Sequence, residues 1–313
     1  MNHLISRVRG CVKKALPKAG KTCLWLLKII LPISLLVRLL QYSGLLGELS
    51  LMPGSVFSLI GLPGETAIVF ITSIFTPLYA PVALITSMQL TVRQATILAL
   101  MCLTSHNLPV ECAVQSKTGS GFWEMAILRV FMSFFIAMCL HWVMPSEGWG
   151  VTSATASAGA CYGIRDVFIH WFMSSMKVTL TILLIVTALM ILHYILDEFR
   201  LMQKLSAVLA PLMKLFGLPE DAAFLWLTGN VVGLAYGGAI MAEQAEQGKL
   251  SPANGKLLNY HLAMSHSLLE DSLIFIAIGI PALWIIFTRL FFAIVVVWLR
   301  RAYNYYYVRK IVI

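Results

Sequence analysis

Long apolar stretches alternate with short breaks that are polar or contain glycine and proline. Apolar runs near the length of about 20 residues that a helix needs to cross a bilayer lie at residues 22–43, 66–88, 125–144, 178–196, 222–242 and 281–299. Two other apolar runs, at 94–104 and 257–269, are too short to span alone. This pattern predicts an all-α integral membrane protein.

The breaks between these runs follow a pattern that occurs twice. The motif GLPGETA at 61–67 returns as GLPEDAA at 217–223. About 40 residues further on, the motif SHNLPVE at 105–111 returns as SHSLLED at 265–271. Each motif combines a carboxylate with a hydroxyl, an imidazole or a helix-breaking residue in an apolar setting. The chain therefore contains two related halves.

The spacing between the two copies is nearly constant. Glu65 precedes Asp221 by 156 residues, and Arg129 precedes Arg289 by 160 residues because the second copy has a longer loop. Spacing preserved over such a length indicates an internal duplication. If each copy crosses the membrane three times, the odd number makes the two copies inverted relative to each other, as in many transporters.

Each copy is expected to cross as a first helix, the helix after its GLP motif and a last helix. On this arrangement the SH motif lies at the turn of a re-entrant hairpin, with broken helices meeting near the midplane. The sequence leaves open which of the two breaks in each copy is a hairpin tip and which is an unwound crossing. This topology places most of the 23 Lys and Arg residues, and both termini, on the cytoplasmic side. That distribution follows the positive-inside rule.

The chain divides into five segments on this basis. They are a basic N-terminal arm at 1–20, a first repeat at 21–145, a linker with a surface helix at 146–176, a second repeat at 177–303 and a basic C-terminal tail at 304–313.

Composition supports the membrane assignment. Of the 313 residues, 59% are hydrophobic and 12% are charged, and the mean hydropathy is +0.84, outside the range of soluble domains. The net charge of +9 comes from basic residues clustered at the termini and in a few loops, which indicates membrane orientation rather than a nucleic-acid surface. The six cysteines form no CxxC pair, so they indicate packing rather than a disulfide framework or a metal site.

Three acidic residues follow the two GLP turns. Proline suits the first turn of a helix, where its missing N–H costs nothing, and Glu65, Glu220 and Asp221 then lie where the helix dipole favours negative charge. One interpretation is a helix-terminal acid with only a local role. The other is a carboxylate deep in the bilayer that binds a hydroxyl, an amine, a cation or an arginine, and the apolar setting favours it.

The second motif combines histidine with acids. His266 and Glu270 are four residues apart, which would place them on one helix face, whereas Pro109 interrupts this spacing in the first copy. Glu111 matches Asp271 by repeat position. A histidine beside a carboxylate suits proton coupling or ligation of a divalent metal. The alternative is a buried histidine–acid hydrogen bond that only packs helices.

These residues define a candidate substrate- or ion-binding site near the midplane, between the two repeats. Its members carry a carboxylate, imidazole, hydroxyl or amide group inside apolar sequence. They are Glu65, Thr66, His106, Asn107, Glu111, Glu220, Asp221, Asn230, His266, Glu270 and Asp271.

The two GLP motifs, together with the SH motifs and their acids, resemble the nucleoside-recognition or Gate domain family. This family is similar to the core of concentrative nucleoside transporters, to the membrane part of B-type ferrous-iron transporters and to spore-maturation membrane proteins. The resemblance covers residues 21–144 and 177–303. It implies that Glu65, Thr66 and Ala67 match an acidic hairpin tip that contacts the nucleoside, although Gly64 stands where those transporters have glutamine.

The patterns and the resemblance together imply a multi-pass transporter in the cytoplasmic membrane of a bacterium. The expected cargo is a small polar solute, either nucleoside-like, an organic ion or a divalent metal, coupled to H⁺ or Na⁺. No other cofactor and no nucleic-acid partner are expected; the lipid bilayer surrounds the protein, and a homodimer is one option for its assembly. The alternatives are a non-transporting membrane component that docks a partner protein and an intramembrane metal enzyme, which the absence of an HExxH pattern disfavours.

Overall fold

The structure, a computed structural model, describes residues 2–43, 51–145 and 163–311, and the regular elements over these residues are helices. The longest are α1 (Asn2–Tyr42), α8 (Phe122–Val143), α9 (Ile164–Glu198) and α15 (Ala282–Ile311). Three of them, α8, α9 and most of α15, are long and apolar enough to cross a membrane. They confirm three of the predicted apolar runs. The run at 125–144 ends the first half, and the runs at 178–196 and 281–299 begin and end the second.

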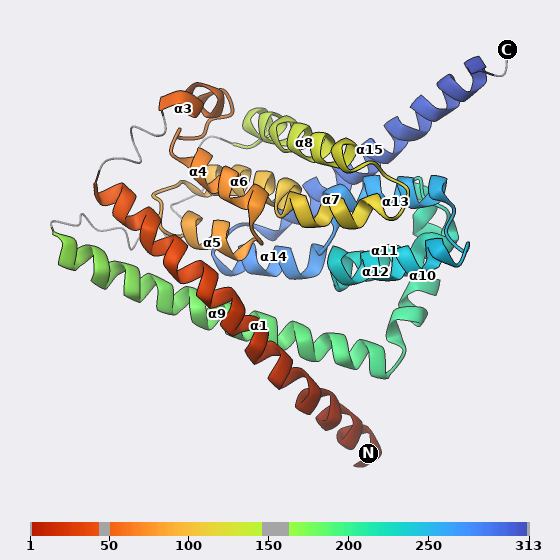
Figure 1. Cartoon of the computed structure of the whole chain (residues 1–313), viewed down its shortest axis with the longest axis horizontal. Helices are drawn as coiled ribbons and strands as arrows, with labels where there is room; N and C mark the ends of the chain where they lie inside the picture. The colour runs from red at the N-terminus through yellow and green to blue at the C-terminus, as the bar shows by residue number, and fades with distance from the viewer. Residues whose placement is uncertain (1, 44–50, 146–162, 312–313) are drawn as a thin grey trace.

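Helices α1 and α9 cross each other along one side of the molecule (Figure 1). Arg7 Nε lies 2.9 Å from Glu198 Oε1 at one end of this crossing. Each helix joins segments that the sequence analysis separated: the basic arm continues into the first apolar run, and the expected surface helix before residue 177 continues into the next span. Helix α9 contains neither glycine nor proline, so nothing in its backbone interrupts it. Residues 146–162 of the expected linker lie outside the described residues.

Each Gly-Leu-Pro motif closes a short helix. Helix α3 (Leu51–Ser58) ends just before Gly61, and α10 (Leu201–Leu215) ends just before Gly217. Both glycines have a φ of 72°. In both turns the residue after the glycine donates its N–H to the carbonyl five residues earlier, at 3.0 and 2.8 Å. The two motifs thus form the same left-handed helix cap, a conformation in which glycine avoids the steric penalty of a Cβ.

The stretches after these turns do not cross the membrane as single helices, so that prediction was wrong. The first stretch forms α4 (Thr66–Phe75) and α5 (Tyr79–Ile85), and the second forms η2 (Glu220–Ala222), α11 (Ala223–Val231) and α12 (Leu234–Glu246). A helix of about ten residues covers only about 15 Å, half of the hydrocarbon thickness. None of the helices in these stretches is therefore long enough to span a bilayer alone.

Local residues explain both interruptions. Thr76 precedes a proline and is extended, with φ −128° and ψ 157°, because proline disfavours the helical conformation of the residue before it. In the second half, Gly233 has a φ of 96°, and α12 turns back against α11. A Cβ on Gly237 would lie 2.9 Å from the Cα of Gly229, so the two helices pack backbone to backbone. The glycines from 229 to 238 serve this close helix contact.

Both SH motifs break a helix without reversing it. Helix α6 (Val92–Ser105) continues into α7 (Leu108–Ser116) with a bend of 41°, which is far from the reversal at a hairpin tip. Helix α13 (Pro252–Ser265) is likewise followed, after a break at residues 266 and 267, by α14 (Leu268–Ala277). Of the two arrangements that the sequence left open, the 41° bend favours a broken span over a hairpin tip at the first SH motif.

The break has the same geometry in both halves. His106 and His266 both have extended ψ values of 156°, and the residues that follow them, Asn107 and Ser267, are left-handed with φ 48° and 50°. One extended residue and one left-handed residue stop the helical hydrogen-bond ladder and restart it in a new direction.

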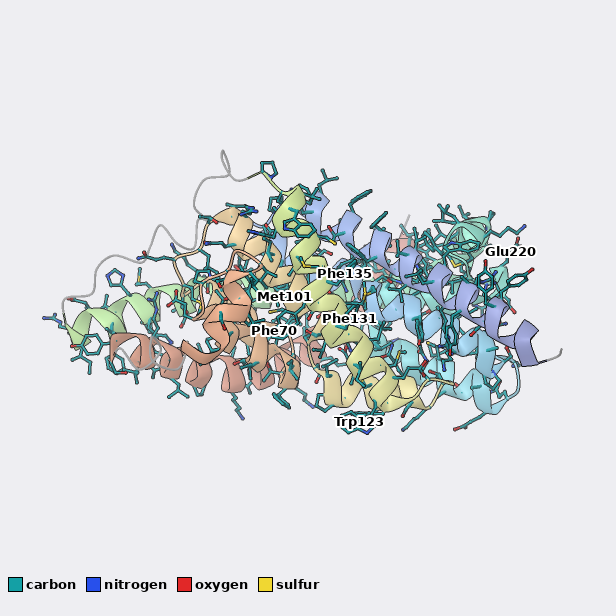
Figure 2. All side chains as sticks on the ribbon, turned by 90° about the horizontal axis from the view of Figure 1, so that it is seen from above. Phe70, Met101, Trp123, Phe131, Phe135 and Glu220 are labelled. Carbon is teal, nitrogen blue, oxygen red and sulfur yellow. The ribbon has the colours of Figure 1, made fainter. Side chains whose placement is uncertain are left out.

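The broken helices lie at the centre of the molecule. Most residues of α6 and α13 are fully buried, and α8 packs on α6 as α15 packs on α13. Helix α8 shows the two environments on its two faces: Trp123, Ile127 and Phe131 are exposed, whereas Arg129 is fully buried. In Figure 2 the Trp123 side chain points away from the protein. In a membrane protein such an apolar outer face contacts lipid, while the charged group faces inward.

Candidate functional site

Six ionisable side chains meet where the two helix breaks face each other inside the protein. All six are buried. Each half contributes one histidine from the break, one acid from the first turn of the next helix and one arginine from the long helix that follows. They are His106, Glu111 and Arg129 in the first half, and His266, Asp271 and Arg289 in the second.

Glu111 is the centre of this cluster. Its Oε2 lies 2.6 Å from Nη1 of Arg129 and 3.1 Å from Nε2 of His266. Its Oε1 lies 3.2 Å from Nε2 of His106. One carboxylate of the first half therefore contacts ionisable groups from both halves.

The two arginines attach to the carbonyls that each helix break leaves unpaired. Arg129 Nε donates to Thr104 O at 2.7 Å, and Arg289 Nε donates to Met264 O at 3.0 Å. The Nη2 atom of each arginine also donates to the carbonyl of the break histidine in its own half. A planar guanidinium suits this role because its donors form a rigid fork. The arginines thus satisfy backbone groups that would be costly to bury unpaired.

The second acid lies further from its arginine than the first. Asp271 Oδ2 lies 3.6 Å from Nη2 of Arg289, too long for a hydrogen bond. Among the described residues, Oδ2 of Asp271 and Nη1 of Arg289 are buried without a hydrogen-bond partner. A buried polar group without a partner costs free energy, so this end of the cluster has unused hydrogen-bonding capacity.

The two histidine rings lie side by side. Their centroids are 5.1 Å apart, with 33° between the ring planes. Nδ1 of His266 lies 2.7 Å from Leu262 O, and Nδ1 of His106 lies 3.2 Å from Cys102 O. Each ring is thereby anchored to its own helix, and its Nε2 atom points into the cluster.

A divalent metal does not fit this cluster well, although its donor atoms are close together. One ligand atom from each of His106, His266 and Asp271 lies within 4.8 Å of the others, and imidazole and carboxylate are suitable ligands for several metals. However, Arg129 and Arg289 already balance the two carboxylates. A divalent cation would add two positive charges that nothing here compensates, which is expensive away from water.

The other predicted members of the SH motifs lie beside the cluster or support it. Glu270 Oε1 accepts a hydrogen bond of 2.7 Å from the hydroxyl of Tyr79, which belongs to the opposite half. The prediction that His266 and Glu270 share a helix face was wrong, because the helix breaks between them. Asn107 is the left-handed residue of the first break, and its N–H donates to Ser73 O at 2.8 Å.

Asn230 lies on α11 and is buried. Its Nδ2 donates to Trp226 O at 2.9 Å, four residues earlier in the same helix. Its Oδ1 has no hydrogen-bond partner among the described residues. This oxygen is therefore an unused acceptor inside the protein.

The predicted acids of the GLP motifs lie apart from the cluster. Thr66 is buried and its hydroxyl donates to Pro63 O at 2.7 Å, while Glu65 is only half-buried. Glu220 and Asp221 are exposed, and Figure 2 shows Glu220 at the outer edge of the molecule. Over the described residues, no hydrogen bond or ion pair joins these acids to the six-residue cluster.

Glu220 has a local partner instead. Lys214 Nζ lies 2.7 Å from Glu220 Oε1 across the Gly-Leu-Pro turn, and the hydrogen bond to Glu220 raises the pKa of this lysine. Because the pair is exposed, it adds little to stability. The GLP turns thus place their acids at helix ends, and the SH motifs build the buried site.

The sequence analysis did not include Arg129, Arg289 or Tyr79 in the site. A signal for the two arginines was present: each is a charged residue inside a spanning helix, and they occupy matched positions in the repeat. Tyr79 carried no such signal, because a tyrosine in an apolar run is common in membrane helices.

Comparisons with known proteins agree with a membrane protein. No model of a known protein family matches the chain, and no solved structure matches it. Over 268 residues the chain is 30% identical to the uncharacterized membrane protein YvoD of Bacillus subtilis (strain 168), and this match covers 84% of the chain and 85% of YvoD. The chain therefore belongs to the family of membrane proteins that includes YvoD.

Proposed function

We propose that this protein is a multi-pass transporter of a small polar solute, coupled to an ion or a proton. Its site lies between two Gate-type repeats that are inverted relative to each other. The observation that carries the proposal is the position of Glu111, which pairs with His106 and Arg129 of its own half and with His266 of the other. A group bound there contacts both halves at once.

Energetics support this proposal. Ionisable groups inside a membrane protein are costly, and they are retained mainly in ion or substrate pathways. Transporters commonly place their binding sites where broken helices from two repeats meet. Here the broken helices α6–α7 and α13–α14 carry the buried charges, whereas the lipid-facing side of α8 is apolar.

The unused polar atoms suggest the chemistry of the cargo. Asp271 Oδ2, Asn230 Oδ1 and the hydroxyl of Ser272 are buried without hydrogen-bond partners among the described residues, as are the Nη1 donors of Arg129 and Arg289. Oxygen acceptors of this kind suit a solute that offers hydroxyl or amine donors. A nucleoside-like solute or an organic cation has such groups, and the resemblance to the Gate family supports the same class.

Both termini are proposed to lie in the cytoplasm of a bacterium, with the protein in the cytoplasmic membrane. The support is the clustering of basic residues in the N-terminal part of α1 and at the end of α15.

Uptake into proteoliposomes tests transport. Wild-type protein would be assayed with nucleosides, organic cations, organic anions and divalent metals, each under a proton gradient and under a sodium gradient. The matched variants are Glu111→Gln in the cluster and Glu198→Gln, whose carboxylate pairs with Arg7 near the protein surface. Glu65→Gln and Asp221→Asn test the acids of the GLP motifs.

The expected result is gradient-driven uptake of one solute class by wild type and by Glu198→Gln. Glu111→Gln should lose about tenfold to a hundredfold, the usual effect of losing a hydrogen bond to a charged group. Wild-type rates in Glu111→Gln would show that the cluster is not the transport site. No uptake of any class by folded wild-type protein would contradict transport and favour a membrane component that docks a partner protein.

A further inference from the structure

The histidine contacts at Glu111 cannot all be made by neutral rings. A backbone carbonyl only accepts hydrogen bonds, so Nδ1 of His266, which lies 2.7 Å from Leu262 O, carries a hydrogen. The same holds for Nδ1 of His106 beside Cys102 O. A neutral imidazole has only one N–H. In a neutral ring, therefore, each Nε2 would present only a lone pair.

Both Nε2 atoms face a group that also accepts. The Glu111 carboxylate oxygens lie 3.2 Å from Nε2 of His106 and 3.1 Å from Nε2 of His266. These distances are within the range of hydrogen bonds, but Nε2 of His266 and Oε2 of Glu111 are buried without a hydrogen-bond partner among the described residues. Two acceptors without a hydrogen between them repel. A protonated Glu111 would supply one hydrogen for two contacts, and its Oε2 also lies 2.6 Å from Nη1 of Arg129. With neutral histidines and an ionised carboxylate, no hydrogen is available for these contacts. The group therefore needs at least one additional proton.

The surrounding charges favour a single added proton. Arg129 from α8 and Arg289 from α15 balance Glu111 from α7 and Asp271 from α14 when both rings are neutral. Glu270, the remaining acid next to this group, is bound by the hydroxyl of Tyr79 from α5. One proton adds one positive charge, which the adjoining carboxylates can stabilise, whereas a divalent metal adds two.

We propose that His106, Glu111 and His266 bind one excess proton between the two halves of the protein. The proton is held on a histidine Nε2 and shared with the Glu111 carboxylate. Resting on the proposed transport function, we assign this proton as the coupling ion. When the proton leaves, lone pairs and carboxylate oxygens face each other and repel, so deprotonation favours separation of the two breaks. Protonation and closure of the site are thereby linked.

A third buried histidine provides an internal control. Trp226 Nε1 donates to Nδ1 of His261 at 3.1 Å, so this Nδ1 is an acceptor and the hydrogen of His261 lies on Nε2. His261 is as buried as His266 but faces no carboxylate among the residues with which it makes hydrogen bonds. We therefore expect His261 to be neutral and of the opposite tautomer.

Nitrogen NMR of histidine-labelled full-length protein in lipid bilayers at pH 7 reads these states directly. The signals would be assigned with His106→Gln, His266→Gln and His261→Gln. The expected result is an imidazolium signal from the His106–His266 pair and a neutral Nε2–H signal from His261. Loss of the imidazolium signal in Glu111→Gln would confirm that the carboxylate holds the proton. Two neutral rings with unprotonated Nε2 atoms in wild type would overturn the proposal.

Measuring the metal content of the protein distinguishes a bound proton from a bound divalent metal ion. Purified wild-type protein and the His106→Gln variant would each be incubated with Zn²⁺, Fe²⁺ or Mn²⁺ and then desalted. We expect no stoichiometric metal in wild type that is absent from the variant. Retention of such metal would overturn the assignment of a proton. The spectroscopic result does not depend on uptake, so an imidazolium pair in a protein with no flux would contradict transport alone. Uptake driven only by sodium, with the imidazolium present, would overturn the assignment as coupling ion.

Discussion

Oε2 of Glu111 lies 3.1 Å from Nε2 of His266, although the two residues belong to different halves of the chain. The contact forms because each residue lies at the break of a central helix: Glu111 in the first turn of α7, and His266 at the end of α13. The sequence had instead placed His266 on one helix face with Glu270, four residues further along the chain. The relationship joins the two halves through a charged contact rather than through apolar packing alone.

Replacing Arg129 should destabilise the protein strongly. Arg129→Met removes the 2.6 Å partner of Glu111 and leaves the carbonyls of Thr104 and His106 without their donor. Breaking a buried ion pair in this way costs about 3 to 5 kcal/mol. Thermal unfolding in detergent, followed by intrinsic fluorescence, measures the effect. The control is Arg165→Met, because Arg165 is exposed on α9; equal melting temperatures for the two variants would contradict the prediction.

The acids of the two motif types should differ in their effect on stability. Glu111→Gln weakens a buried carboxylate that contacts three ionisable groups, whereas Glu220→Gln removes only an exposed contact with Lys214. We expect a lower melting temperature for the first and no measurable change for the second, since surface ion pairs contribute little. A clear loss of stability in Glu220→Gln would show that the exposed pair has a larger role than its geometry indicates.

Adding one methyl group at Gly237 should disturb the packing of α11 on α12. The new Cβ would lie 2.9 Å from the Cα of Gly229, and a backbone atom cannot move aside as a flexible side chain can. Overpacking of this kind costs about 1 to 3 kcal/mol. Gly20→Ala in α1 is the matched control, because nothing lies within 4 Å of its Cβ and alanine is the better helix former by about 1 kcal/mol. Thermal unfolding should shift in opposite directions.

The Tyr79 hydroxyl should stabilise the contact between the halves. Tyr79→Phe removes its 2.7 Å hydrogen bond to Glu270, and a hydrogen bond to a charged group contributes about 1.5 to 3 kcal/mol. The exposed Tyr306 gives the control Tyr306→Phe, for which we expect no change. If Tyr79→Phe unfolds at the wild-type temperature, the hydrogen bond makes no net contribution.

Accessibility of single cysteines tests the proposed orientation. In a background without the native cysteines, Arg165→Cys lies exposed at the start of α9, which the proposed topology places outside the cytoplasm. A membrane-impermeant thiol reagent should label it in intact cells. Lys204→Cys, exposed on α10, should react only after the membrane is permeabilised. Labelling of position 165 from the cytoplasmic side alone would contradict the orientation.

The sequence by itself determined the class of protein and the positions of its interruptions. Apolar runs near 20 residues long predicted α8, α9 and α15, because the length and hydrophobicity of a segment are local properties and together decide whether it can span a bilayer. Gly61 and Gly217 marked the ends of two helices, and the SH motifs marked the breaks in two others. The matched spacing also placed His106 opposite His266 and Glu111 opposite Asp271 in the two copies.

Only the tertiary structure decided how the chain continues after each interruption and which side chains then meet. A left-handed residue at 107 or 267 redirects the helix, so Glu270 no longer lies on the same face as His266. A proline or glycine interrupts each stretch after a GLP motif and prevents a single crossing there. The pairing of Glu111 with His266, and the attachment of both arginines to broken-helix carbonyls, depend on packing between residues far apart in sequence. Hydrophobic periodicity records which face of one helix is buried, but it does not record the neighbour that buries it.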